Sequence, residues 1–163
     1  MRRTRLVAAI GVSLCSALVT GSQAAPPVEL SEALRARVKN ERLEMVTSIR
    51  GLPLGVRESL QTLFGSSSLD IADPGATFEM SGVAGSPKLP IRRLVAAGCS
   101  TEYCLVYYER GGAPRTGHVA LFHWLPEATR FEWGGTAPTG LATIDEVRNA
   151  VLSGAIKNPN RLW

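Results

Sequence analysis

The sequence predicts an α+β fold in which helices cover one face of a four-stranded antiparallel sheet, in the order α-α-β-β-β-β-α. Helical patterns occupy the segments before residue 65 and after residue 143, and four short strand-like segments lie between residues 91 and 135. Even spacing and short connections of this kind are typical of an antiparallel meander. The flanking helices are then expected to form a second layer on the sheet.

Three helices are expected. Ser31 is placed to cap a helix that runs through about residue 46, with most of its charges on a solvated face. A shorter helix spans about residues 53–64, where apolar residues recur along one stripe. The third begins at Thr143, and Glu146 three residues later gives the spacing of a capping box.

Residues 65–90 are rich in Gly, Ser, Pro and Asp and are expected to form mainly loop. Asp73, Pro74 and Gly75 form a strong turn signal, and a short strand is possible over residues 76–80. Loops of this length in small domains are usually functional or mobile. The 65–90 loop is therefore a candidate binding surface.

The four strands are expected over residues 91–100, 102–110, 117–125 and 129–135, with a tight turn joining the first two. Aromatic residues cluster in these strands, and alternation assigns each ring to a face of the sheet. Tyr103 and Tyr107 should share one face and Tyr108 the other. Phe122 should share a face with Trp124, and Phe131 with Trp133.

Helices on one face would leave some of these rings on an open face of the sheet, where they could bind a protein edge or a glycan. The candidate binding residues are Tyr103, Tyr107, Trp124 and Trp133. The alternative is that the rings pack across strands and stiffen a small sheet.

The N-terminal segment has the three parts of a secretory signal peptide. Arg2, Arg3 and Arg5 precede an apolar run over residues 6–19, and small residues at positions 22 and 24 predict cleavage after Ala24. The apolar run is short for a membrane span, although an uncleaved anchor is the alternative. We expect a periplasmic or secreted protein in which residues 25–163 form a single α+β domain.

Signal cleavage changes the charge argument. The chain has 18 basic and 14 acidic residues, a net charge of +4. Because the predicted signal removes three arginines and no acid, the remainder is close to neutral, and net charge gives no support for nucleic-acid binding. Beyond the signal, no apolar run has membrane-spanning length.

Cys99 and Cys104 remain after signal cleavage, and with His118 and His123 they give C-x4-C-x13-H-x4-H, which is close to a zinc-site spacing. The histidines, however, are five residues apart in a strand-like segment and should point to opposite faces. A redox pair would need nearby positive charge or a helix N-terminus. We therefore predict a disulfide across the first hairpin turn and no metal.

Glu109, His118, His123, Asp145 and Glu146 are the plausible acid or base groups. The last two are explained by the start of a helix, where negative charge is favourable. No recognised nucleophile, metal or phosphate-binding motif accompanies the others, and no cofactor is expected. A small hydrolase using Glu109, His118 and His123 is the enzymatic alternative.

The runs "YERGGAPRTGHVALFHWLPEATRFEWGGTAP" and "VRNAVLSGAIK" resemble small exported proteins of Gram-negative bacteria whose activity is not known. The resemblance covers residues 91–157 and implies a periplasmic location. It implies no activity and no site residues.

The sequence therefore predicts an exported binding protein that acts through a sheet face and the 65–90 loop. Its partner would be another envelope protein or a glycan, with no nucleic acid and no membrane span after cleavage. The alternatives are the small periplasmic enzyme and a structural or assembly factor of the cell envelope.

Overall fold

The first helix is shorter than the sequence predicts. In the computed structural model, which describes residues 29–81 and 89–157, α1 spans Glu32–Asn40. The Ser31 side chain caps it as expected, accepting a hydrogen bond of 3.2 Å from the Leu34 amide. The chain turns extended at Glu41 and enters a short strand, β1 (Glu44–Val46), so the predicted continuation of the helix to residue 46 is wrong.

The extra strand makes the sheet five-stranded rather than four-stranded. All neighbours pair antiparallel, in the spatial order β1-β2-β3-β4-β5, so the predicted antiparallel meander is confirmed for the last four strands. These strands are β2 (Arg92–Cys99), β3 (Tyr103–Arg110), β4 (Thr116–Leu125) and β5 (Ala128–Ala137).

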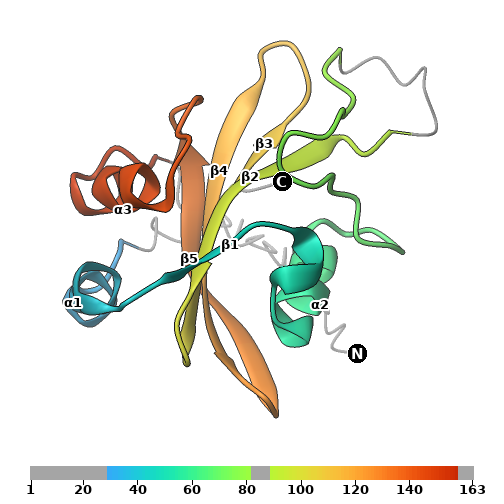
Figure 1. Cartoon of the computed structure of the whole chain (residues 1–163). Helices are drawn as coiled ribbons and strands as arrows, with labels where there is room; N and C mark the ends of the chain where they lie inside the picture. Colours follow the sequence, from blue (N-terminus) through green and yellow to red (C-terminus); the bar gives the residue numbers. More distant parts are fainter. Residues whose placement is uncertain (1–28, 82–88, 158–163) are drawn as a thin grey trace, which may run out of the picture.

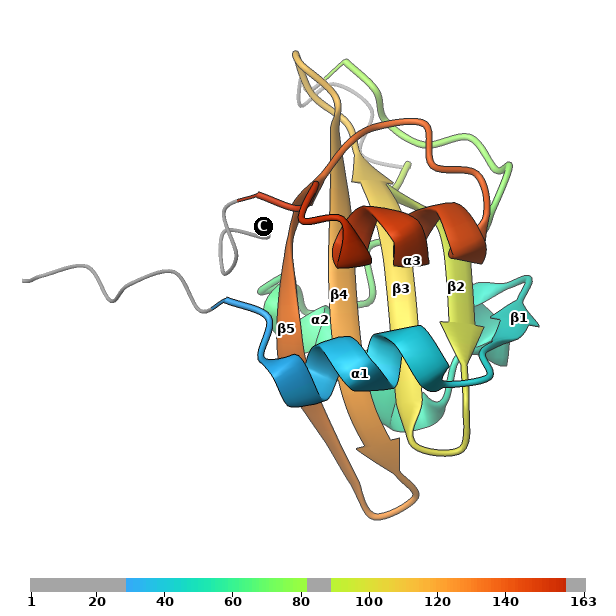
Figure 2. The ribbon, with the colours of Figure 1, turned by 90° about the vertical axis from the view of Figure 1, so that its left-hand side faces the viewer.

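Helices cover both faces of the sheet, which corrects the prediction of a single covered face. α1 and α3 (Ile144–Leu152) lie side by side on one face, while α2 (Leu54–Leu63) lies on the other (Figures 1 and 2). The cause is β1: the chain leaves α1, runs along the sheet edge as β1, and reaches the opposite side before α2 begins. The α+β class is confirmed, but the architecture has three layers.

Each face carries its own apolar cluster. Val38 of α1 and Val147 and Val151 of α3 pack against one face, and Val56 and Leu60 of α2 against the other. Alternating strand residues supply the matching side of each cluster. Tyr103 and Tyr107 contribute to the α1/α3 cluster and Tyr108 to the α2 cluster, so their predicted placement on opposite faces is confirmed.

α2 approaches the sheet unusually closely at Gly55. A Cβ atom at this position would overlap Thr129 Oγ1 and lie 2.9 Å from Thr129 Cβ. Glycine thus brings the start of α2 against β5, while Leu52 and Val56 beside it are buried in the α2 cluster.

Two β-bulges change the register of the sheet. One lies between Leu94 and Ala96 in β2, and the other is in β5, where Trp133 pairs with Leu121 but Phe131 pairs with Phe122. The second bulge places Phe131 in the α2 cluster and Trp133 in the α1/α3 cluster. The prediction that these two rings share a face is therefore wrong, because the extra residue breaks the simple alternation.

The described part of the 65–90 loop is tied to the sheet. Residues 76–80 form no strand, contrary to the prediction, but the turn at Asp73 is confirmed by the Ala76 amide donating to the Asp73 carbonyl at 3.1 Å. Ala72 forms a parallel bridge with Arg93 of β2, and Ile71 and Phe78 are buried. The loop therefore packs along the start of β2.

The capping box of α3 is confirmed. Thr143 Oγ1 accepts a hydrogen bond from the Glu146 amide at 3.2 Å, and the Glu146 carboxylate accepts one from the Thr143 amide at 3.1 Å. None of the helices in the described residues is long and apolar enough to span a bilayer. The predicted signal peptide and its cleavage site at Ala24 lie outside the described residues.

Candidate functional site

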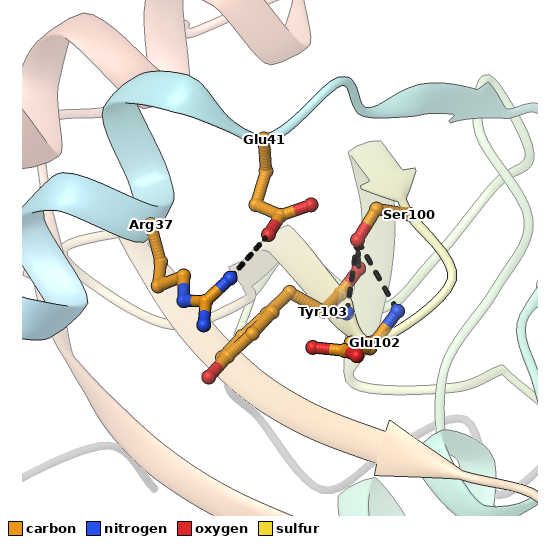
Figure 3. A network of polar contacts seen from close by, with 5 residues as sticks. All are labelled: Arg37, Glu41, Ser100, Glu102 and Tyr103. Carbon is orange, nitrogen blue, oxygen red and sulfur yellow. Dashed lines mark hydrogen bonds and ion pairs between the residues drawn. The ribbon is translucent and has the colours of Figure 1, made fainter.

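The β2–β3 hairpin ends in the predicted disulfide. Cys99 and Cys104 are direct cross-strand partners and are bonded to one another, with their Cα atoms 4.1 Å apart. Between them, Ser100 Oγ accepts hydrogen bonds from the amides of Glu102 (3.3 Å) and Tyr103 (3.0 Å) (Figure 3). The bond and the serine together hold a tight turn.

Trp124 of β4 fastens this turn to the next strand. Its indole Nε1–H donates to the Ser100 carbonyl at 3.1 Å, and its backbone amide donates to the Glu102 carbonyl at 2.7 Å. These bonds fix the orientation of the half-buried ring. Trp124 is therefore a rigid aromatic group beside the disulfide.

Tyr103 is held against the opposite face of the hairpin. The Arg37 guanidinium of α1 lies 5.7 Å from the Tyr103 ring centroid and 3.4 Å from a Glu41 carboxylate oxygen (Figure 3). The His123 ring packs on Tyr103 with the centroids 4.9 Å apart. These contacts connect α1 to the hairpin and occupy much of the tyrosine ring.

The four candidate binding residues do not form one surface. Tyr107 is fully buried, and its hydroxyl donates to the Pro138 carbonyl at 3.0 Å. Trp133 is 5% exposed in the α1/α3 cluster, whereas Tyr103 and Trp124 are half-buried on opposite faces. The prediction of an open aromatic sheet face is wrong, because helices cover both faces.

Trp124 does line a groove at the β1 end of the sheet. We call this the Met45–Trp124 groove; it has a volume of about 740 Å³ and lies between β1, the disulfide-closed turn and the segment before α2. Met45 is 74% exposed, the highest value among the large apolar residues in the described structure. The groove is lined by Met45 and Trp124 together with Arg42, Val46, Pro53 and Thr101, among others. Met45 pairs with Gly98, which faces α3, so its side chain leaves β1 toward the α1/α3 face, whereas Trp124 packs on the α2 cluster.

The three candidate acid or base residues are not brought together. Glu109 pairs in register with Gly117 and forms ion pairs with Arg93 (3.1 Å) and Arg115 (3.6 Å). His118 is the next residue along β4 and therefore points to the other face. His123 lies five residues further, packed on Tyr103, so the predicted opposite orientation of the two histidines is supported by their different neighbours.

A polar cluster that the sequence reasoning missed lies under the α2 side of the sheet. Arg92 and Arg110 are direct cross-strand partners, and His118 stacks on Tyr108 with ring centroids 5.2 Å apart. Burial and the two nearby guanidinium groups lower the pKa of His118 to about 4, so its ring is neutral at neutral pH. Burial also lowers the pKa of Arg92.

Within the described residues, no group of three or more His, Cys, Asp or Glu side chains is placed to hold a metal ion. Cys99 and Cys104, which gave the sequence its near-zinc spacing, are bonded to one another in a disulfide. Comparison of the chain with family models, with curated proteins and with solved structures finds no match.

Proposed function

We propose that the chain is an exported binding protein and that it holds a protein partner in the Met45–Trp124 groove. The observation that carries the proposal is the exposure of Met45 on the edge strand β1, which lines the groove together with the fixed tryptophan. Met and Trp are both enriched in protein interfaces, and Trp is common among the residues that dominate binding energy.

The composition of the groove favours a protein over a glycan. Met45, Val46, Pro53 and Trp124 are its apolar lining residues, and charged and hydroxyl-bearing residues line it as well. Protein–protein interfaces combine apolar and polar side chains in this way. A partner that packs against Trp124 and extends over the β1 edge to cover Met45 fits this arrangement.

The hairpin supports the proposal because it makes one wall of the groove rigid. The disulfide and the two Trp124 hydrogen bonds fix that wall before any partner arrives. Preorganised contacts lower the entropy cost of binding. The predicted signal peptide and the disulfide, which suits an oxidising compartment, support export.

The enzymatic alternative has no such support. Glu109 is neutralised by two arginines on one face, His118 is buried on the other, and His123 is packed against Tyr103. A general acid and base must reach one substrate, and these three residues share no site. An envelope assembly role remains compatible with a protein partner.

Site-specific photo-crosslinking tests the proposal. A photo-reactive amino acid replaces Met45 in the full chain, expressed in the periplasm of its own host. The matched control carries the same amino acid at Met80, which is 57% exposed and outside the groove. We expect a discrete protein adduct from position 45 only.

A variant of a residue that lines the groove tests whether the crosslink depends on the groove. Thr101→Arg, at an exposed turn residue of the groove, should abolish the adduct without affecting folding. The adduct must then be reproduced with the purified partner. Equal adducts from positions 45 and 80 would refute the groove as the site, and binding only to polysaccharides would refute a protein partner.

A further inference from the structure

We infer that Arg92 and Arg110 form a binding site for an anionic group, a carboxylate or a phosphate, on the α2 side of the sheet. The site is separate from the Met45–Trp124 groove and shares no residue with it. It lies where the described part of the 65–90 loop meets the beginning of β2.

The first observation is an imbalance of charge. Arg92 and Arg110 occupy directly opposed positions on β2 and β3, where like charges destabilise a sheet. Asp70 is the one carboxylate paired with either of them in the described residues, and it contacts Arg92 at 3.1 Å. Arg110 forms no ion pair with any described residue, so the pair carries an excess positive charge.

The second observation is burial. Arg92 is only 4% exposed, and its Nε has no hydrogen-bond partner among the described residues; the same is true of the Nε of Arg110. Arg92 has one carboxylate partner, Asp70, and half-buried Arg110 has none among the described residues, so two opposed cations share a single negative charge, and incomplete pairing of a buried cation is costly. An anion on these two side chains would remove the cost, which is why the cluster is better explained with a ligand than without one.

The third observation is that Arg92 is already positioned. The guanidinium carbon of Arg92 lies 4.0 Å from the centroid of the Phe64 ring. That ring packs edge-on against Tyr108, with the two ring centroids 5.2 Å apart. Asp70 Oδ1 also accepts a hydrogen bond from the Ile91 amide, at 3.2 Å, which holds the carboxylate in place. A guanidinium fixed in this way loses little freedom when it binds an oxyanion.

His118 supplies a further polar group beside the arginines. It is 5% exposed, its Nε2 lies 2.8 Å from Thr116 Oγ1, and its Nδ1 has no partner among the described residues. When the Thr116 hydroxyl donates to Nε2, the neutral ring carries its proton on Nδ1. That N–H is a donor, as an anion requires.

The geometry also indicates how a ligand arrives and what it can be. Arg110 and its cross-strand neighbour Thr116 are half-buried, whereas Arg92 and His118 are buried, so an oxyanion would approach from the Arg110 side. The guanidinium fork matches both carboxylate and phosphate oxygens in pairs. A single oxyanion group on a larger molecule therefore fits.

Calorimetric titration of the full chain tests the inference, with inorganic phosphate and acetate as the probes and sodium chloride at matched ionic strength as the reference. We expect saturable binding of at least one probe with a dissociation constant of about 1 mM. Preference between the probes distinguishes a phosphate-bearing from a carboxylate-bearing ligand. Absence of saturable binding of both probes would overturn the inference.

Matched variants locate the binding. Arg110→Gln should weaken it at least tenfold, and Arg110→Lys should keep part of it, because lysine retains the charge but loses the fork. Arg130→Gln, at an exposed arginine that is distant in the sheet register, should leave it unchanged. Equal loss in the Arg110 and Arg130 variants, or no loss in Arg110→Gln, would overturn the site.

Discussion

The close packing of α2 against the sheet predicts that a side chain at Gly55 lowers the stability of the protein. In Gly55→Ala, the new methyl group would overlap Thr129 Oγ1 and lie 2.9 Å from Thr129 Cβ, closer than real Cβ atoms approach. The helix must shift or the threonine must rotate, and such overpacking costs about 1–3 kcal/mol. Against this, alanine is favoured over glycine by about 1 kcal/mol in a helix interior, and by less at Gly55, which is the second residue of α2.

The steric term should dominate because two residues close to Gly55 in the chain, Leu52 and Val56, are buried. Leu52 and Val56 lie in the α2 cluster on either side of it, so a shift of α2 disturbs their packing. We expect a net loss of about 1–2 kcal/mol in the free energy of unfolding. Urea denaturation measures it as a lower transition midpoint with an unchanged slope.

A double-mutant cycle isolates the contact. Thr129→Ala removes the overlapping Oγ1, so Gly55→Ala should cost less in that background than in the wild type. If Gly55→Ala instead raised stability by the helix-propensity amount, the close approach of α2 to β5 would be refuted.

Three further predictions follow from the cysteines, His118 and the groove. Replacing Cys99 and Cys104 together by alanine should lower the free energy of unfolding by about 2 kcal/mol, measured by urea denaturation, because a short loop is no longer closed; unchanged stability would contradict a structural role. The pKa of His118 in the folded protein, about 4, lies below its unfolded value, so stability should be full above about pH 6.5 and fall as the pH drops toward 4. His118→Gln should flatten this pH dependence, and equal slopes in both proteins would argue against a buried neutral histidine. The methyl group of Met45, used as a probe, should lose solvent accessibility when the partner is bound. Continued exposure of this methyl group would contradict burial of Met45 by the partner.

Local signals predicted their elements well. Ser31 and Thr143 cap helices because each side chain reaches a free amide in the next turn, which needs only neighbouring sequence. The hairpin disulfide also followed from local spacing, since Cys99 and Cys104 flank a turn that brings opposed residues together.

The second covered face was not predictable from such signals. β1 is only three residues long and follows a charged helical run, so its pairing with β2 is decided by tertiary contacts. Without β1, nothing in the sequence takes the chain around the sheet edge before α2. The apolar stripe of α2 indicates that the helix packs against the sheet, but it does not indicate on which face of the sheet the helix lies.

The bulge in β2 explains why the arginine cluster was missed. Extending the register from the Cys99–Cys104 pair would place Arg93, rather than Arg92, opposite Arg110. The irregularity between Leu94 and Ala96 shifts the pairing by one residue and brings Arg92 and Arg110 together. A bulge is set by three-dimensional packing, so the alternation of the sequence alone does not identify this pair.

The central claim is that the Met45–Trp124 groove binds a protein partner. The most direct test is the dissociation constant of the partner identified by crosslinking, measured for the wild type, Met45→Ala and Met80→Ala. Burial of the Met45 side chain predicts about tenfold or greater weakening for Met45→Ala. Met80→Ala should bind as the wild type does. An unchanged constant for Met45→Ala, or the same loss in both variants, would contradict the claim.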